Sequence, residues 1–586
     1  MTKHRKSSRL KPPRLNTRPN WHTRDLETRQ PVAQKVDSTE APKPAAAGNS
    51  SQLKKQPSLG KTFSLVALFT VLSKFAGLLR DMVVASAFGT TMIADAYNIA
   101  TLFTGNILVL FGGLGGPFHS SAVAVLTPRK DSGDCGRLTV QLLVWTGLIT
   151  GLLALIVFAL APYIVPLVAP GSGSEAEKLK LWHETTMQLR IMSPLILIAG
   201  LVGIGCGISN TYNQFFWPSM APAVASLCII ISCLGFKGSG ETGLCLAAGT
   251  LAGAIGQFLV QLPGMLKAHP TFRDLKLFSK MEPGMKEYLH MLWPATISTS
   301  IGYIYSYVDV FFTSQMGEGG WTALVTANRL VQLPLGVLLT AMLVPILPRF
   351  TMQVTEGKID DLKSELRRAL TLLWFLALPM SALLLALPQP IVQLLFQRGA
   401  FNQHSTELVT TVLFFLVPSI FFYVARDLVT RVFYAHKDSK TPYYVGLAAI
   451  GVKLFITWFL AVPLAMGLGG IALSTSIITV FNLSLLSILL RKKIGRLGAG
   501  KLIKPVGIMI TAACCCGLSA GFGYGYLVQA AAALKTSLKL PLPHLLELAI
   551  PLGFAAGIGG LVYMAICYLF KLDEVKQITK TLARRG

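Results

Sequence analysis

Apolar runs of about 20 residues recur along the chain from residue 62 to residue 570, separated by short polar or charged stretches. An α-helix needs about 20 residues to cross the hydrocarbon core of a bilayer, so each run is long enough to do so. The pattern predicts helices near residues 62–89, 92–117, 138–168, 185–208, 217–236, 243–264, 286–314, 321–347, 366–388, 407–435, 441–463, 467–491, 504–529 and 545–570. We therefore expect an all-α polytopic membrane protein with about 14 transmembrane helices.

The charged residues between these runs indicate how the chain is threaded through the membrane. Cytoplasmic loops are enriched in Lys and Arg, and every second loop here is basic if the first 61 residues are cytoplasmic. The basic loop residues are Arg129, Lys130, Arg137, Lys267, Arg273, Lys276, Lys280, Arg349, Lys358, Arg367, Arg368, Lys437, Lys440, Arg491, Lys492, Lys493, Arg496, Lys501 and Lys504. This alternation predicts that both termini are cytoplasmic, with a disordered basic tail over 1–61 and a short tail over 571–586.

Composition argues against several other classes of protein. Only 14% of the residues are charged, against about 25% in soluble domains, and the mean hydropathy is +0.56. The net charge of +26 would suit a nucleic-acid-binding protein, but it is concentrated in the tail and the alternate loops, so we predict no nucleic-acid partner. The nine cysteines show no metal-ligand spacing, and the GxxxxGK, HExxH and GxSxG motifs are absent from the sequence. We therefore predict neither an enzyme nor a cofactor or metal site.

Short motifs repeat at a nearly constant spacing. The segment LTPR (126–129) returns as LPRF (347–350), and NTYNQFFWP (210–218) corresponds in position to YAHKDSKTP (434–442). The corresponding prolines are 220 and 224 residues apart, which predicts two six-helix lobes in the same orientation, related by a pseudo-two-fold axis along the membrane normal. The predicted parts are the tail 1–61, the N-lobe 62–264, the C-lobe 286–491, a pair of helices in 504–570 and the tail 571–586.

Charged side chains stand inside several of the apolar runs. In SKFAGLLRDMVVASAFG (73–89), Lys74, Arg80 and Asp81 lie where lipid would be expected. A charge at the bilayer centre costs about 2.5–3.5 kcal/mol on insertion scales, so these side chains should face a polar cavity or one another. Further charges of this kind are Asp95, Asp309, Arg329, Arg426, Asp427, Arg431 and Lys453.

Two of these charges stand at matched depth in the two lobes. Arg80 and Arg329 each lie about eight residues, roughly 12 Å, from the outer end of their predicted helix. A cavity between the lobes lined by Lys74, Arg80 and Arg329 would suit an anionic headgroup, because a guanidinium presents a planar fork of donors to phosphate.

Other roles are open for the same residues. Arg80 and Asp81 are also compatible with a structural ion pair. Asp309 is the best candidate to bind a coupling cation or a proton, and pairing with Arg329 is the alternative. Lys453 could extend toward the membrane surface or support packing.

Several stretches resemble the MviN/MurJ family, the lipid II flippases within the multidrug/oligosaccharidyl-lipid/polysaccharide exporter superfamily. The matching stretches are SKFAGLLRDMVVASAFGTTMIADAY (73–97), SNTYNQFFWPSMAP (209–222), ANRLVQLPLGVLLTAMLVPILPRF (327–350), LLFQRGAF (394–401) and FYAHKDSKTP (433–442). The resemblance implies a fourteen-helix fold with a V-shaped central cavity. It also implies that the last two helices, 504–570, form a groove for the undecaprenyl tail of the lipid.

The same resemblance assigns roles to individual residues. It places the family's essential cavity arginines at Lys74, Arg80 and Arg329 and its helix-two aspartate at Asp95, and Asp309 stands at the proposed sodium site. This sequence departs from the pattern at three positions, which are Lys74 for an arginine, Leu108 for a further cavity arginine and Gln332 for an acidic residue. The predicted substrate-binding set is Lys74, Arg80, Asp81, Asp95 and Arg329, with Asp309 as the candidate for the coupling ion.

The charge placement and this resemblance together predict a lipid II flippase of the bacterial inner membrane. It would move undecaprenyl-diphosphate-linked peptidoglycan precursor from the inner to the outer leaflet by alternating access, and so serve cell-wall synthesis and cell shape. The membrane potential, or a coupling Na⁺ or H⁺, would reset the cycle. The alternatives are a flippase for another polyprenyl-linked glycan, a cation-coupled exporter of the same superfamily, and a non-transporting scaffold that recruits wall-synthesis proteins. Expected partners are lipid II or a related glycolipid, membrane lipids and, for a scaffold, those proteins.

Overall fold

The computed structural model describes residues 59–113, 116–130, 135–235, 243–268, 281–498, 500–538 and 544–575. Secondary structure in these ranges is helical throughout, joined by turns and short irregular segments. Nearly all of the predicted N-terminal tail and residues 576–586 of the predicted C-terminal tail lie outside them.

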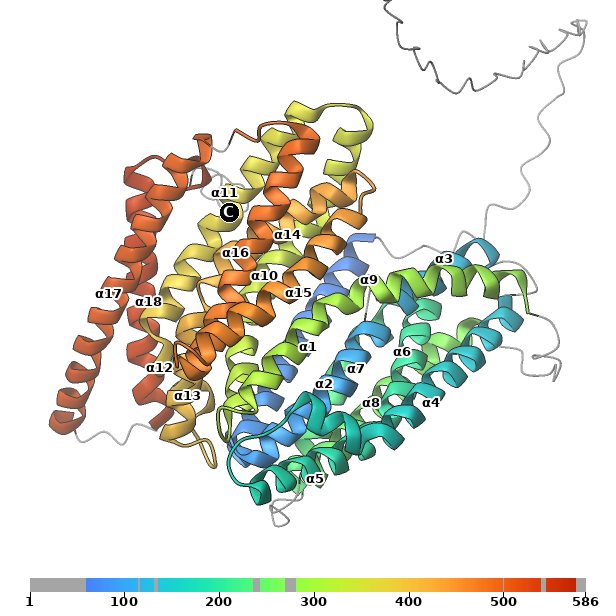
Figure 1. Cartoon of the computed structure of the whole chain (residues 1–586). Helices are drawn as coiled ribbons and strands as arrows, with labels where there is room; N and C mark the ends of the chain where they lie inside the picture. The colour runs from blue at the N-terminus through green and yellow to red at the C-terminus, as the bar shows by residue number, and fades with distance from the viewer. Residues whose placement is uncertain are drawn as a thin grey trace, which may run out of the picture. The chain divides into compact units, whose positions relative to one another are not determined.

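Every predicted apolar run corresponds to one helix or to two consecutive helices (Figure 1). The helices of the first half are α1 (Leu59–Phe88), α2 (Met92–Gly112), α3 (Pro117–Leu126), η1 (Thr127–Arg129), α4 (Cys135–Val168), α5 (Glu175–Met192), α6 (Pro194–Thr211), α7 (Phe216–Gly235), α8 (Leu244–Met265) and η2 (Leu266–Ala268). Those of the second half are α9 (Pro283–Thr313), α10 (Gly320–Thr355), α11 (Ile359–Ala386), α12 (Pro388–Phe396), α13 (Gln403–Leu416), α14 (Ser419–Ala435), α15 (Lys440–Ala461) and α16 (Gly467–Ile494). The chain continues with α17 (Gly500–Leu538) and α18 (His544–Leu569). We refer to α1–α8 as the N-half and to α9–α16 as the C-half.

Fewer helices of the described ranges meet a test of length and apolar composition for a membrane span than the fourteen predicted from the sequence. Within the described ranges, ten helical segments are long and apolar enough to cross a membrane, or eleven if α13 and α14, bent by 47°, count as one span. Helix α1, which carries the charges of the 73–89 segment, is not among them, and neither are α9 and α10.

Helix α9 joins the two halves. Its first part carries Met285, Tyr288 and Leu292, which are buried in a cluster with α3 and α4 of the N-half. Its second part packs on α15, where the Tyr305 hydroxyl donates a hydrogen bond to the Gly446 carbonyl over 2.9 Å. Residues on the second part of α9 are therefore placed by the C-half.

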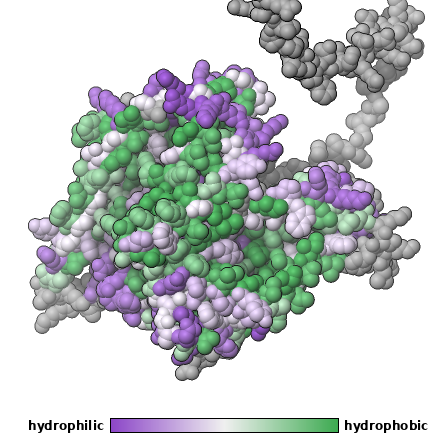
Figure 2. Space-filling model, viewed as in Figure 1, coloured by the Kyte–Doolittle hydropathy of each residue, from purple (hydrophilic) through white to green (hydrophobic). Residues whose placement is uncertain are grey.

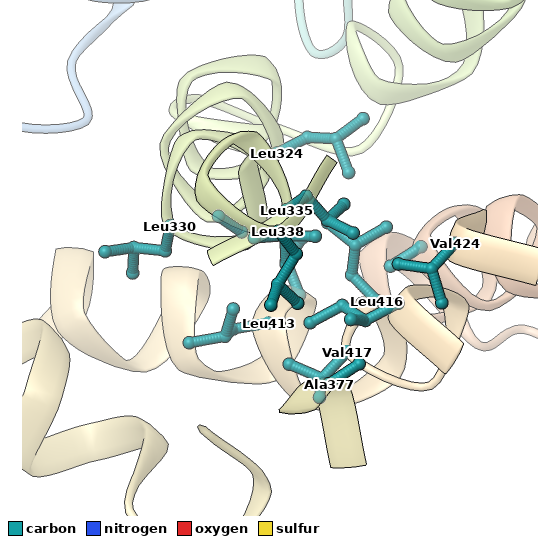
Figure 3. Packing of buried hydrophobic residues seen from close by; sticks show 14 of the residues in the cluster. Leu324, Leu330, Leu335, Leu338, Ala377, Leu413, Leu416, Val417 and Val424 are labelled. Carbon is teal, nitrogen blue, oxygen red and sulfur yellow. The ribbon is translucent and has the colours of Figure 1, made fainter. Parts of the chain in front are cut away.

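Helix α10 is held in one rotation by a leucine-rich face. In Figure 3, Leu335 and Leu338 of this helix approach side chains of α11, α13 and α14, all of them buried. Leucines spaced by three to four residues lie on one side of a helix, so burying that side turns the remaining side away from this core. Arg329 thereby faces the cavity described below.

The outer surface of the bundle is apolar where lipid would cover it. Figure 2 shows hydrophobic residues across the middle of the visible face and hydrophilic residues gathered toward its upper and lower edges. Helices α17 and α18 pack side by side, with α17 on α11 (Figure 1). Phe522 and Leu561 on this pair are each 72% exposed, a degree of exposure that large apolar side chains tolerate in hydrocarbon but rarely in water.

Candidate functional site

A central cavity of about 720 Å³ lies between the two halves. Residues of α1 and α2 line it from the N-half, and residues of α9, α10 and α12–α16 line it from the C-half. Its charged lining residues are Lys74, Arg80, Arg329, Arg426 and Lys453, against Asp81 and Asp309. Five cations face two carboxylates, so the cavity carries a surplus of positive charge and suits an anionic ligand.

Arg80, Asp81 and Arg329 form an ion cluster that links the two halves. Arg80 donates to Oδ1 of Asp81 from Nη2 over 2.8 Å and from Nε over 3.0 Å. Nη1 of Arg329 lies 3.0 Å from the same oxygen. The Asp81 side chain is 10% exposed, whereas those of Arg80 and Arg329 are 30% and 33% exposed. Both arginine side chains therefore keep part of their surface accessible, and both line the cavity.

The cluster explains how two arginines can face each other across the interface. Two guanidinium groups on one oxygen would repel if that oxygen carried no charge, and the carboxylate offsets this repulsion. One negative charge balances only one of the two cations, so the cluster as a whole stays positive. The expected ion pair of Arg80 with Asp81 is present, and it includes Arg329 as well.

Lys74 lies on the same helix as Arg80, nearly two turns away. Its side chain is exposed and its ammonium lies beside Gly336 of α10. A Cβ at position 336 would be 3.1 Å from Nζ of Lys74. The flexible lysine stem adds a mobile positive charge to this wall of the cavity.

Asp309 is paired with Lys453 rather than with Arg329. Nζ of Lys453 lies 2.8 Å from Asp309 Oδ1 and donates to the Thr475 hydroxyl over 2.9 Å. The alternative prediction that Asp309 would pair with Arg329 is therefore wrong, because Arg329 is turned toward Asp81.

Two cavity cations were absent from the predicted site. Arg426 of α14 lines the cavity with its guanidinium 4.1 Å from the centre of the Tyr423 ring, which is cation–π geometry. Lys453 lines it from α15. The available signal was a charge inside an apolar run, but that signal alone does not say whether a residue faces the cavity or a structural partner.

Asp95 does not line the cavity. Its Oδ2 accepts a hydrogen bond from the backbone N–H of Gly319 over 2.7 Å, and its Oδ1 accepts one from Thr322 over 2.8 Å. These are free amides at the start of α10, where a carboxylate is favoured by the helix dipole. Glu318 of the C-half in turn caps α2 of the N-half: its Oε1 accepts a hydrogen bond from the backbone N–H of Met92 over 2.7 Å.

This reciprocal capping belongs to a larger contact that we call the closed end, where residues 86–95 of the N-half meet residues 318–322 and 399–405 of the C-half. The Ala400 amide donates to the Ser86 carbonyl over 2.8 Å, and the hydroxyls of Thr90 and Ser405 lie 2.8 Å apart. A Cβ at Gly399, where φ is +61°, would overlap the Ser86 carbonyl. The two backbones approach so closely only because this residue is glycine.

The chain resembles known proteins over most of its length. The family described as "Lipid II flippase MurJ" matches residues 84–539. A protein of Synechocystis sp. named "Probable lipid II flippase MurJ" is 33% identical over 470 residues, which is 78% of this chain and 86% of the relative. The protein of the same name from Thermotoga maritima is 27% identical over 422 residues, covering 72% and 83% of the two chains.

Two solved structures share the fold. One, described as "Lipid II flippase MurJ, inward closed conformation", superposes with a TM-score of 0.67 at 23% identity, covering 87% of this chain and 99% of the other. The second is an inward-facing multidrug resistance MATE family transporter of the MOP superfamily, with a TM-score of 0.60 at 14% identity, covering 74% and 98%. At these identities the likeness concerns the fold alone.

Proposed function

The chain belongs to the MurJ family of lipid II flippases, and from that premise we propose that it carries lipid II across the membrane by holding the diphosphate of the headgroup in the central cavity. The observation that carries this proposal is the cluster in which Arg80 of one half and Arg329 of the other share a single carboxylate oxygen of Asp81. Asp81 occupies the position of an anion between two guanidinium forks, and a diphosphate offers the same chemistry with more charge and more acceptor oxygens.

Binding would proceed by exchange of partners. A diphosphate entering the cavity would compete with Asp81 for the guanidinium groups of Arg80 and Arg329, while Lys74 and Arg426 add positive charge from the surrounding walls. Because the two arginines belong to different halves, a ligand held by both also holds the halves together. The headgroup can therefore influence how the halves are arranged.

Transport requires the closed end to open. The mutual caps of Asp95 and Glu318 and the contact between Thr90 and Ser405 must break for the headgroup to leave on that side. This gives Asp95 the role of a gate residue, whereas its predicted contact with substrate stays a prediction. The prenyl tail would remain in lipid, where the exposed apolar faces of α17 and α18 offer it a surface.

The charges of the chain bear on the energy source of transport and on the orientation of the protein in the membrane. Moving one charge through the membrane potential is worth about 2.3 kcal/mol per 100 mV, which is enough to bias such a cycle without a nucleotide. The basic loops favour cytoplasmic termini in a bacterial inner membrane, with loading from the cytoplasmic leaflet. A scaffold would gain nothing from two desolvated arginines on one carboxylate, so transport accounts for the site better.

The test is the accessibility of lipid II in the outer leaflet of cells depleted of this protein and supplied with wild type, Arg80→Ala or Arg329→Ala. Losing a charge-assisted contact costs about 1.5–3 kcal/mol, so each variant should lower transport by roughly tenfold or more. Arg190→Ala is the matched control, because Arg190 is exposed and stacks over Phe158 at 5.4 Å.

Both outcomes are informative. Full transport by both cavity variants would exclude the diphosphate model. Outer-leaflet lipid II that does not change on depletion would instead point to another polyprenyl-linked glycan as the substrate.

A further inference from the structure

The pair of Asp309 and Lys453 is the most secluded charged feature of the central cavity. The Lys453 side chain is 1% exposed and that of Asp309 is 11% exposed, although both border the cavity. A lone buried charge is costly, so each of these groups depends on the other. The pair joins α9 to α15 across a separation of 144 residues, from 309 to 453.

We propose that the Lys453 ammonium permanently occupies the cation position at Asp309, so that the transport cycle neither binds nor releases a dissolved metal cation there. This inference deepens the proposed function, because it concerns the energy source of the same cavity.

The surroundings of the ammonium are those of a small cation. Nζ lies between the Asp309 carboxylate at 2.8 Å and the Thr475 hydroxyl at 2.9 Å, so oxygen atoms from α9 and α16 face it. Hard cations take oxygen ligands of these two kinds, namely carboxylate and neutral oxygen. The ammonium therefore stands where Na⁺ would otherwise have to bind.

The position of Lys453 is itself built into the fold. One turn further along α15, the Thr457 hydroxyl donates to the Ser474 hydroxyl of α16 over 2.8 Å, and both residues are fully buried. This contact fixes the two helices against each other beside Thr475. Lys453 therefore reaches Asp309 from a rigid base, without the freedom of a surface lysine.

The other charged residues that line the cavity, among those the structure describes, offer no second free carboxylate. Asp81 and Asp309 are the carboxylates among the described residues that line the cavity, and Asp81 already contacts Arg80 and Arg329. Both carboxylates thus have partners supplied by the chain. A tethered ammonium cannot diffuse away, so a Na⁺ gradient has no group here on which to act.

The experiment measures cation binding by the purified full-length protein without any lipid substrate. Saturable ²²Na⁺ binding and thermal unfolding would be followed as NaCl replaces choline chloride at constant ionic strength. We expect wild type to show neither saturable binding nor a Na⁺-specific change in Tm. Lys453→Met, which removes the ammonium but keeps an unbranched side chain only one atom shorter, should bind Na⁺ saturably and gain a few degrees in Tm.

Two further variants isolate the site. The double variant Asp309→Asn/Lys453→Met should lose the Na⁺ response, and it should fold because a buried ion pair can be replaced by neutral groups without loss of stability. Arg329→Met removes another cavity cation but leaves Asp309 with its partner, so it should bind no Na⁺.

Three results would overturn the proposal. The first is saturable Na⁺ binding by wild type that Asp309→Asn abolishes. The second is a folded Lys453→Met that binds no Na⁺. The third is Na⁺ binding by Arg329→Met that equals the binding by Lys453→Met. If Lys453→Met does not fold, Lys453→Gln replaces it, and the wild-type measurement still decides. Because no lipid is present, the result is independent of which headgroup the protein carries.

Discussion

At the scale of single residues, Asp81 is the side chain on which the two arginines of the cavity converge. One of its oxygens contacts guanidinium groups from α1 and α10, at 2.8 and 3.0 Å. Asp81 competes with an incoming anion for the two arginines, and it pairs with them again once the anion has left. A residue with both effects should slow binding and speed release.

Replacing Asp81 by Asn tests this double effect. The amide keeps the shape but removes the charge, so we expect undecaprenyl diphosphate to bind several-fold more tightly, while transport slows because release is impaired. Binding to the purified protein and flipping in liposomes would be measured side by side. Asp427→Asn is the control, since Asp427 pairs with Arg431 at 3.8 Å and does not line the cavity. Weaker binding by Asp81→Asn would contradict the competition model.

At the scale of elements, the helices are tied together by a few polar contacts at their ends. Asp438, in the turn between α14 and α15, accepts from the Thr441 backbone N–H over 3.0 Å and from Lys493 of α16 over 2.7 Å. Partial burial alone would raise the pKa of Asp438, but the hydrogen bonds from Lys493 and Thr441 prevail and lower it to about 2. The turn thus links three consecutive helices.

This contact predicts a pH-dependent contribution to stability. Asp438→Ala removes an N-terminal cap and should cost about 1 kcal/mol near neutral pH. Because the folded pKa lies below the unfolded value of about 3.9, the charge stabilises the fold above about pH 4, and this contribution is lost as the pH falls toward 2. The difference in Tm between wild type and Asp438→Ala should narrow over that range. A difference that is constant from pH 6 to pH 2.5 would mean that the charge of Asp438 is not involved.

At the scale of the whole molecule, the closed end and the cavity are two contacts between the same two halves. The N-half and C-half meet through backbone and caps at one place and through Asp81 with Arg329 at another. Alternating access requires the first contact to open while α9, which packs on both halves, keeps them connected. Locking the closed end should therefore stop transport without unfolding the protein.

A reversible cross-link tests this requirement. The hydroxyls of Thr90 and Ser405 lie 2.8 Å apart, so Thr90→Cys/Ser405→Cys places two thiols in contact across the closed end. Oxidation should abolish flipping in liposomes, and a reductant should restore it. The two single variants and oxidised wild type, which has nine cysteines of its own, serve as controls. Transport by fully cross-linked protein at the uncross-linked rate would rule out opening at this end.

The sequence by itself determined the helices and the presence of a charged interior. Apolar runs of membrane length predict helices because hydrocarbon leaves the backbone no partner but itself, and a charge within such a run predicts a polar surrounding. These are local properties, readable within about 20 residues. The expectation that Arg80 and Arg329 share one cavity followed from their matched depth in the two predicted lobes.

Only the tertiary structure decided which charges meet. Asp309 pairs with Lys453 instead of Arg329, and Asp95 caps α10 instead of lining the cavity. Helical periodicity specifies a face within one helix, but a partner more than a hundred residues away depends on how helices rotate and cross. That rotation is set by the packing of leucine-rich faces such as that of α10, which no stretch of sequence shows when read alone.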